Sequence, residues 1–236
     1  MLELYTWATP NGHKPHILLE ELGVPYVLKP VNIFEGEQLE EGFWSINPNR
    51  RIPALIDRSD PNAPVRVFES GAVLFYLAEK YQRFLPKSPA GRWEAISWLN
   101  WQMGGLGPML GQGQHFFSYA TEKHPYSIDR YTKEGQRLLT VMDRHLGEHE
   151  YLADEYSIAD IACFPWVRIH KLCNLSIEAM PNLKRWYGAI RGRPAVERGM
   201  NILRERLTGV PSTKAAHDVM FGDKQFQESK ARTSAS

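Results

Sequence analysis

The chain has 236 residues, of which 43% are hydrophobic and 23% charged, and its formal net charge is +1. This length fits one large domain or two modest ones, and the balanced charge argues against a nucleic-acid or anionic-membrane partner. Its only cysteines, Cys163 and Cys173, are too few for a disulfide framework, so we expect a reducing, cytoplasmic compartment. The first residues predict a strand rather than a basic and apolar leader, and no run approaches about 20 apolar residues, so we expect neither secretion nor a membrane span.

Hydrophobic periodicity in the first third of the chain alternates between the strand and helix patterns. The expected elements are strands over residues 2–7, 26–31, 53–57 and 65–68, and helices over residues 15–22, 38–46 and from Ser70 onward. A β-α-β unit as short as the first one places its two strands in parallel, whereas the turn-rich residues 59–64 predict an antiparallel hairpin. The order β-α-β-α-β-β-α predicts an α/β domain over residues 1–81.

After a linker at residues 82–90, which is punctuated by prolines, the strand pattern ends and the remaining periodicity is helical. Helices are expected over residues 93–117, 128–146, 158–170, 183–190 and 195–207. Ser157 and Asp160 have the spacing of a capping box at the start of the third of these helices. The sequence therefore predicts an all-α domain over residues 91–207.

The end of the chain has a different character. Residues 208–236 are polar and predict a C-terminal extension that is partly disordered. Phe221 and Phe226 interrupt the polar pattern, so we expect part of the extension to dock on the folded chain. The sequence assigns this extension no role.

Five short segments carry a resemblance to a known family. They are Thr9-Pro10-Asn11-Gly12-His13-Lys14, Ile52-Pro53, Glu69-Ser70, the glycine-rich residues 104–112, and residues 156–163. With these segments, residues 1–207 resemble a cytosolic glutathione transferase, in particular the Nu-class bacterial enzymes and the transferase-like domain of a fungal nitrogen regulator. The resemblance implies a thioredoxin-like, glutathione-binding N-terminal domain joined to an all-α C-terminal domain. It also implies glutathione-dependent disulfide reduction, weak conjugating activity, and a homodimer that holds oxidised glutathione or two reduced molecules.

The resemblance assigns the peptide backbone of the ligand to Ile52 and Pro53. The family keeps a cis-proline at the position of Pro53, which turns the preceding backbone outward. Ile52 would then offer its N–H and C=O to an extended peptide, as a neighbouring strand does. The alternative is an ordinary proline at the start of a strand.

Glu69 and Ser70 open the third expected helix. A serine cap and an acidic residue near the positive end of a helix are common in any protein, which is the alternative interpretation. The resemblance instead implies that the Ser70 hydroxyl and the first backbone N–H groups of the helix take the α-carboxylate of the γ-glutamyl group. Glu69 would pair with the α-ammonium of the same group.

Thr9 and Asn11 lie at the start of the first expected helix, where the resemblance places the thiol of the ligand. A helix N-terminus and small polar donors stabilise a thiolate. Thr9 lies where several classes keep an activating serine, and Asn11 matches the residue that Nu-class enzymes place beside the sulfur. The alternative is a Pro-Asn-Gly turn that only caps the helix. Tyr5 in the first strand either competes as the catalytic hydroxyl or belongs to the core.

Four further residues are candidates for the carboxylates of the ligand. Gln38 matches the family position that contacts the glycyl end, and Arg51 and His13 are candidate carboxylate partners. Arg130 resembles an arginine of the second domain that reaches the ligand in related proteins. Simple exposure to solvent is the alternative for the arginines and the histidine.

The glycine-rich residues 104–113 are not a phosphate-binding loop, because the Gly-Lys-Ser/Thr element is missing. Glycine is a poor helix former, so this segment predicts a helix break or the close approach of another backbone, as at the floor of a ligand cleft near a subunit interface. Trp93, Trp98 and Trp101 are expected in the core, as are both cysteines. No histidine has the spacing of a metal ligand, and no metal is expected.

Three functions follow from the sequence, and we favour the first. It is a glutathione-dependent disulfide-bond reductase that uses the thiolate of bound glutathione. The second is a glutathione transferase that conjugates glutathione to small electrophiles. The third is a non-enzymatic, glutathione-binding regulatory protein. The intact ligand motifs argue against this third function, because a scaffold has no need of a ligand site.

Overall fold

Four strands form one mixed sheet in the computed structural model of the protein, which describes residues 1–206 and 213–225. By its internal contacts the chain divides into two units that are each discontinuous in sequence. The first unit consists of residues 1–8, residues 25–69 and the described residues from 203 onward. The second consists of residues 9–24 and 70–202.

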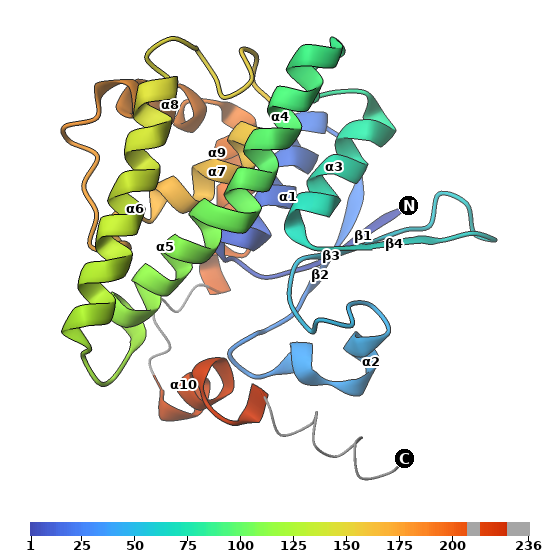
Figure 1. Cartoon of the computed structure of the whole chain (residues 1–236). Coiled ribbons are helices and arrows are strands. Elements are labelled where there is room, and N and C mark those ends of the chain that lie inside the picture. The colour runs from blue at the N-terminus through green and yellow to red at the C-terminus, as the bar shows by residue number, and fades with distance from the viewer. Residues whose placement is uncertain (207–212, 226–236) are drawn as a thin grey trace. The chain divides into compact units, whose positions relative to one another are not determined.

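The sheet of the first unit has the order β2-β1-β3-β4 (Figure 1). Its strands are β1 (Leu2–Thr6), β2 (Tyr26–Pro30), β3 (Ala54–Asp57) and β4 (Val65–Phe68). β1 runs parallel to β2, and β3 is antiparallel to both β1 and β4. All four strands match their predicted positions to within one residue, and the parallel pair and the hairpin are confirmed.

The helical parts of the first unit differ more from expectation. The helix expected over residues 38–46 divides into a 3-10 turn, Glu37–Leu39, and a short helix, α2 (Glu41–Trp44), because Glu40 between them is extended. An additional helix, α10 (Lys214–Phe221), is capped by Thr213, whose side chain accepts a hydrogen bond from the backbone N–H of Ala216.

The helix α10 docks within the first unit. Its Val219 is buried, and a Cβ atom built on Gly36 would lie 3.5 Å from a methyl carbon of Val219. Part of the C-terminal extension therefore docks, as expected, but through Val219. Of the two phenylalanines that suggested docking, Phe221 is half-buried and contacts the His217 ring. Phe226 lies outside the described residues, as does most of the segment expected to be disordered.

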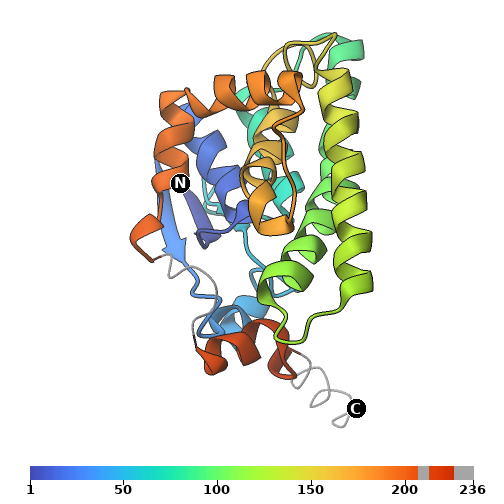
Figure 2. The ribbon, with the colours of Figure 1, turned by 90° about the vertical axis from the view of Figure 1, so that its left-hand side faces the viewer.

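Helices make up the second unit. They are α1 (Pro10–Leu22), α3 (Ser70–Tyr81), α4 (Pro89–Trp101), α5 (Gly107–Gln114), α6 (Pro125–His145), α7 (Ile158–Arg168), α8 (Pro181–Arg191) and α9 (Pro194–Asn201), with a 3-10 turn at His170–Cys173. Five of these helices begin at a proline, one to five residues before the predicted start. Proline lacks an N–H and has a helical φ angle, so it suits the first helical position, where no intrahelical acceptor is available. Figure 2 shows α5 and α6 side by side.

We expected a helix break as one outcome for the glycine-rich segment, but the helix is not broken there. The backbone continues from α4 into α5 through a π-helical turn, Gln102–Leu106, and a second π-helical turn, His115–Tyr119, follows α5. A π-helical turn adds a residue to the helical path and rotates the side chains that follow. The helix expected over residues 93–117 is therefore one helical path with two such turns.

The predicted capping box at α7 is confirmed, and the carboxylate of Asp160 does more than cap. It accepts hydrogen bonds from the backbone N–H groups of Ser157 and Leu152, each at 3.0 Å, and from Nε1 of Trp186 at 2.7 Å. Burial raises the pKa of Asp160 to about 6, while the hydrogen bonds act in the opposite direction. Asp160 thus joins the start of α7 to the preceding loop and to α8.

The tryptophan and cysteine predictions have mixed outcomes. Cys163 and Cys173 are buried, as expected. Trp93 is 65% exposed, so its assignment to the core is wrong. Trp98 and Trp101 are half-buried and contact each other edge to face. The helix α4 therefore turns only one side, with Ala95 and Leu99, toward the core.

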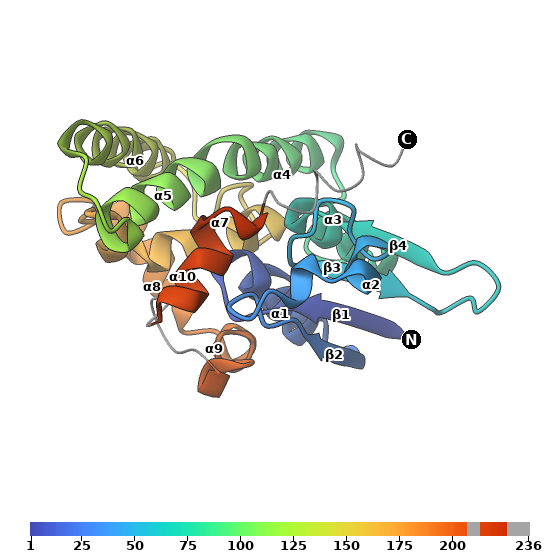
Figure 3. The same ribbon diagram turned by 90° about the horizontal axis from the view of Figure 1, so that it is seen from below.

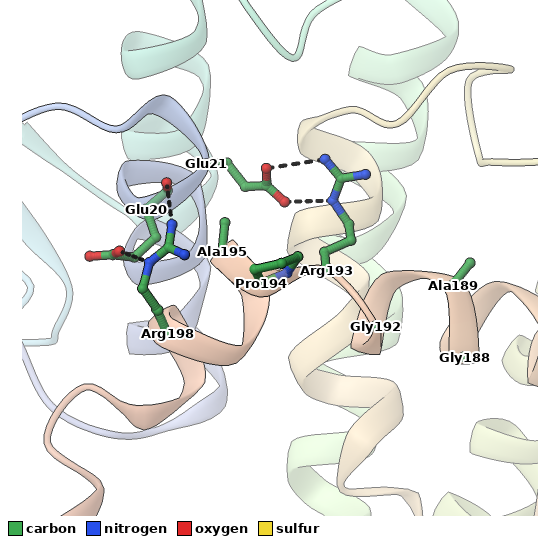
Figure 4. Close-up of a pocket in the computed structure, with 9 residues that line it drawn as sticks. All are labelled: Glu20, Glu21, Gly188, Ala189, Gly192, Arg193, Pro194, Ala195 and Arg198. Atoms are coloured by element: carbon green, nitrogen blue, oxygen red, sulfur yellow. Dashed lines mark hydrogen bonds and ion pairs between the residues drawn. The ribbon is translucent and has the colours of Figure 1, made fainter.

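In the second unit, α1 packs extensively against α9 (Figure 3). Gly199 of α9 lies directly against the backbone of α1, and a Cβ atom built there would be 2.7 Å from Cα of Ile17. Ion pairs that join Arg193 to Glu21 and Arg198 to Glu20 flank this contact (Figure 4). This contact fixes the position of α1 within the unit.

We expect Gly199→Ala to destabilise the protein by about 2 kcal/mol or more, because the added methyl group overlaps backbone atoms that cannot move aside. The matched control is Gly188→Ala on the exposed side of α8, where a Cβ atom would have no neighbour within 4 Å. Alanine is the better helix former, so this control should gain up to about 1 kcal/mol. Urea unfolding of the two variants measures both changes, and equal effects would contradict the assigned contact.

Candidate functional site

Thr9 caps the first helix. It has an extended backbone, and its Oγ1 accepts a hydrogen bond of 3.2 Å from the backbone N–H of Gly12. The Thr9 side chain therefore caps α1, as the alternative interpretation of this segment predicted. Because a hydroxyl both accepts and donates, its hydrogen is still available as a donor at the positive end of α1.

Asn11, in the first turn of α1, is held by a residue that the sequence did not single out. Nε1 of Trp166, on α7, donates a hydrogen bond of 3.0 Å to Oδ1 of Asn11. An indole N–H can only donate, so it fixes which end of the amide is the oxygen. The NH2 group of Asn11 consequently points away from Trp166, and the residue presents a donor rather than an acceptor on its other side.

The glycines of α5 explain how Trp166 reaches Asn11. A Cβ atom built on Gly111 would lie 3.2 Å from the Trp166 ring, and one on Gly107 would lie 3.5 Å from its Nε1. The two glycines are four residues apart and therefore share one helix face. At these two glycines the approaching group is a tryptophan side chain, whereas another backbone lies near Gly113, where a Cβ atom would be 3.8 Å from the carbonyl oxygen of Cys173. In the sequence, the Gly-x-x-x-Gly spacing of Gly107 and Gly111 was the signal that could have indicated a bulky side chain packed against this helix face.

Ser70 begins α3 and is buried with a charged neighbour. Nζ of Lys14 lies 3.1 Å from Oγ of Ser70, 2.6 Å from Oε1 of Gln102 and 3.3 Å from Sδ of Met103. Lys14 is only 1% exposed, although lysine is among the residues least often buried. The sequence places Lys14 in a motif but assigns it no role.

In the first unit, the peptide bond between Ile52 and Pro53 is cis, as the resemblance implied. Ile52 lies just before β3, and among the described residues neither its N–H nor its C=O makes a hydrogen bond. Nδ2 of Asn47 donates a hydrogen bond of 2.6 Å to the carbonyl oxygen of Arg51, which holds the chain immediately upstream.

Glu69 ends the first unit in an unusual conformation. Its φ angle is +69°, in the left-handed region that residues other than glycine rarely adopt. Its carboxylate accepts a hydrogen bond of 3.1 Å from Nδ2 of Asn49 and is exposed. Such strained residues concentrate at functional sites, where the surrounding structure maintains them.

Arg51 and Gln38 of the first unit make specific contacts. A guanidinium nitrogen of Arg51 donates a hydrogen bond of 2.7 Å to Oε1 of Gln225, just after α10. Gln38 is buried, with its amide nitrogen 3.5 Å from the carbonyl oxygen of Ile33, and its Oε1 has no hydrogen-bond partner among the described residues.

Two further candidates differ in environment. Arg130 is exposed on α6 in the second unit, one turn before Glu134. The hydroxyl of Tyr5 in the first unit donates a hydrogen bond of 3.3 Å to the Glu3 carboxylate. Burial and the neighbouring Glu3 raise the pKa of Tyr5, so its neutral form is favoured.

His13, a candidate carboxylate partner, lies in an environment that disfavours its cationic form. His13 is 3% exposed on α1, and burial together with the charge of Arg168 lowers its pKa to about 4. His16, one turn later, is fully buried, and burial lowers its pKa to about 3. Both side chains are neutral near pH 7 and belong to the packing between α1 and α9.

Both thiols of the chain are inert in this structure. Burial raises the pKa of Cys173 to about 12 and holds the pKa of Cys163 well above its usual range. Because the thiolate is the nucleophilic form, neither cysteine is suited to attack a substrate near neutral pH.

Three further features of the described residues bear on possible sites. A cavity of about 670 Å3 in the second unit is lined by residues of α1, α8 and α9, but its arginines are already paired with Glu20 and Glu21 (Figure 4). Within residues 1–206 and 213–225, no group of three or more His, Cys, Asp or Glu side chains is placed to hold a metal ion. None of the described helices has the length and apolar content of a membrane span.

Family models identify the protein class. The model of the glutathione S-transferase N-terminal domain matches residues 1–79, and that of the C-terminal domain matches residues 125–189. The chain therefore belongs to the glutathione S-transferase family. The predicted family and fold class, an α/β thioredoxin-like domain followed by an all-α domain, are confirmed.

Individual relatives agree with this assignment. The disulfide-bond oxidoreductase YfcG of Escherichia coli is 44% identical over 210 residues, which cover 88% of this chain and 97% of YfcG. A glutathione transferase from Pseudomonas putida, solved with one glutathione disulfide bound per subunit, matches with a TM-score of 0.82 and 42% identity over 85% of this chain and 91% of its own. A glutathione transferase from Burkholderia graminis, with two glutathione molecules per subunit, matches with a TM-score of 0.80 and 45% identity over 85% and 87% of the chains.

The buried histidines predict a loss of stability in mild acid. Their pKa values are lowered in the folded protein. As the pH falls below 6.5, these histidines therefore bind a proton in the unfolded chain but stay neutral in the folded chain. His13 binds its proton in the folded chain only when the pH approaches 4. Each histidine should lower the free energy of unfolding by about 1 kcal/mol between pH 7.5 and 5.5. Asp160, whose pKa is raised to about 6, opposes part of this loss because the folded state then binds the extra proton.

The measurement is urea unfolding at pH 7.5 and 5.5 at one fixed protein concentration. His13→Gln should lose about 1 kcal/mol less than the wild type over this interval. His124→Gln, which removes an exposed imidazole, is the control and should behave as the wild type. An unchanged pH dependence in His13→Gln would show that His13 is not held neutral by burial.

Proposed function

We propose that this protein is a glutathione-dependent disulfide-bond reductase in which the thiolate of bound glutathione is the nucleophile. The name of the relative YfcG and the glutathione disulfide in the P. putida structure support this proposal. The observation within the chain that carries it is the hydrogen bond from Trp166 to Asn11, because it turns the amide NH2 of Asn11 outward as a donor.

A thiolate is a hydrogen-bond acceptor, so it needs donors around it. Asn11 offers its NH2 group and Thr9 its hydroxyl hydrogen, both at the first turn of α1, where the helix dipole also favours negative charge. We assign both residues to the sulfur of glutathione. These donors are neutral and lower the thiol pKa without a cation beside the sulfur.

The reaction then needs no thiol from the protein. The sulfur of the first glutathione attacks one sulfur of the substrate disulfide, forming a mixed disulfide and expelling the other sulfur as a thiolate. A second glutathione attacks the glutathione sulfur of the mixed disulfide, which yields glutathione disulfide and a second thiolate. The two protons lost by the glutathione thiols end on the two product thiols, so two glutathiones are oxidised for each disulfide reduced.

The remaining assignments belong to the same proposal. In the second unit, Ser70 takes the α-carboxylate of the γ-glutamyl group, and Arg130 contributes from α6. In the first unit, Glu69 takes the α-ammonium, the backbone of Ile52 beside Pro53 takes the cysteinyl backbone, and Arg51 and Gln38 take the glycyl end.

The proposal extends to the organisation of the protein. We assign residues 1–81 to the glutathione-binding domain, residues 82–90 to a linker, residues 91–207 to the helical domain and residues 208–236 to a C-terminal extension. We further propose a cytoplasmic, Nu-class homodimer that uses glutathione as co-substrate and takes a small-molecule disulfide or electrophile as its partner substrate.

With 2-hydroxyethyl disulfide, glutathione and a coupled glutathione reductase assay, the wild type should turn over, and a Cys163→Ala, Cys173→Ala double variant should keep most of that turnover. Asn11→Ala should lose about tenfold or more in kcat/KM, because it removes a charge-assisted hydrogen bond to the thiolate. Loss of turnover in a folded cysteine variant would return a protein thiol to the mechanism. Efficient conjugation of an aromatic halide with negligible disulfide turnover would instead favour the transferase function.

A second prediction concerns the orientation of Asn11. Trp166→Phe keeps an aromatic ring against Gly107 and Gly111 but releases the Asn11 amide, so kcat/KM for disulfide reduction should fall by about fivefold. Trp98→Phe is the matched control, since it removes an indole donor whose partner, Glu94, lies on the exposed side of α4. Equal activity of the two variants would show that Trp166 does not orient Asn11.

A further inference from the structure

The ammonium of Lys14 lies in the interior of the second unit. Lys14 is 1% exposed, and the groups in contact with its Nζ include the hydroxyl of Ser70, the amide oxygen of Gln102 and the thioether of Met103. None of these three groups carries a charge. Removing an ammonium from water is costly, so a lysine is seldom buried this completely.

Lysine has three N–H donors and no acceptor, so the direction of its hydrogen bonds is unambiguous. Oγ of Ser70 must accept from Lys14, which directs the hydroxyl hydrogen of Ser70 to some other group. The acceptor within reach is Sδ of Met103 at 3.6 Å, and a thioether sulfur is a weak acceptor. Because Ser70 accepts a hydrogen bond from Lys14, its hydroxyl is left as a donor. Its present acceptor, the Met103 thioether, is weak.

The surrounding residues are arranged to keep Lys14 in place. The π-helical turn Gln102–Leu106 carries two of these contact residues, Gln102 and Met103. Gln102 is fully buried, and its Nε2 has no hydrogen-bond partner among the described residues. Gly71 leaves room for Met103, because a Cβ atom there would lie 2.9 Å from the Met103 side chain. π-Helical turns are frequent at functional sites.

We propose that Lys14 is a positioning residue for glutathione: it turns the Ser70 hydroxyl toward the α-carboxylate of the γ-glutamyl group and supplies positive charge behind the start of α3. This inference rests on the proposed function, and it adds a residue and a division of labour to it. Lys14 acts on binding through the carboxylate, whereas Asn11 and Thr9 act on the sulfur.

The proposal separates function from stability. Lys14→Met replaces a buried ammonium by an apolar chain of similar volume. It removes the cost of burying the charge but leaves the acceptors Ser70 and Gln102 without their donor. Urea unfolding measures the net change in stability, and glutathione affinity is then compared in the folded variant.

The experiment compares two peptides by calorimetry. One is glutathione, and the other is 4-aminobutyryl-cysteinyl-glycine, which lacks only the α-carboxylate. Lys14→Met should weaken glutathione binding by about tenfold or more and leave the affinity for the analogue unchanged within about twofold. Lys14→Arg, which keeps charge and donors, should recover part of the preference for glutathione. Lys184→Met on the exposed side of α8 removes the same charge and should bind both peptides as the wild type does.

The outcomes are distinct. If the wild type binds neither peptide, the proposed function fails and the inference fails with it. If the wild type binds glutathione and Lys14→Met weakens both peptides equally, the proposed function stands and the role of Lys14 is structural. Should Lys14→Met not fold, Ser70→Ala with the same two peptides decides: an unchanged preference for glutathione would overturn the inference, because Lys14 is argued to act through Ser70.

KM and kcat provide a further readout. Lys14→Met should raise KM for glutathione, but kcat at saturating glutathione and the pH dependence of kcat should remain those of the wild type, because the sulfur keeps its donors. A change in the pH dependence of kcat would instead place Lys14 in the activation of the thiol.

Discussion

The direct contact between α1 and α9 is the constraint on which the proposed chemistry depends. The first turns of α1 carry Thr9, Asn11 and Lys14, and each of these side chains acts through a hydrogen bond whose geometry tolerates little displacement. Gly199 lets the backbone of α9 touch the backbone of α1 without an intervening side chain. Backbone atoms cannot adopt other rotamers, so this contact positions α1 more rigidly than contacts between side chains would.

A common arrangement underlies both ends of the proposed glutathione site. Asn11 and Ser70 are chemically ambivalent, because an amide or a hydroxyl can donate or accept. Each is backed by a group that only donates, the indole of Trp166 or the ammonium of Lys14. The acceptor capacity of each residue is thereby used inside the protein, and donors remain for the ligand. A thiolate and a carboxylate are both acceptors, so this polarity fits the two anionic parts of glutathione.

Local patterns in the sequence predicted much of the fold. Strand positions followed from alternation, and the cap of α7 followed from Ser157 and Asp160, because these signals involve residues close in the chain. Helix starts were placed too late because they were taken from the onset of helical periodicity, whereas five helices begin at an earlier proline. Trp166 and Lys14 were missed for a different reason. Trp166 contacts a residue 155 positions away and Lys14 one 88 positions away, and no local pattern encodes such a contact.

The distribution of charge between the two ends also agrees with the proposed reaction. A lower thiol pKa gives more thiolate, but each thiolate is then a weaker nucleophile, so the best attacking thiol has a pKa near the ambient pH. Thr9 and Asn11, assigned to the sulfur, are neutral, and neutral donors shift a thiol pKa less than a cation does. The cation, Lys14, contacts Ser70, which is assigned to a carboxylate that is already ionised at neutral pH. Charge placed there increases affinity without reducing the reactivity of the sulfur.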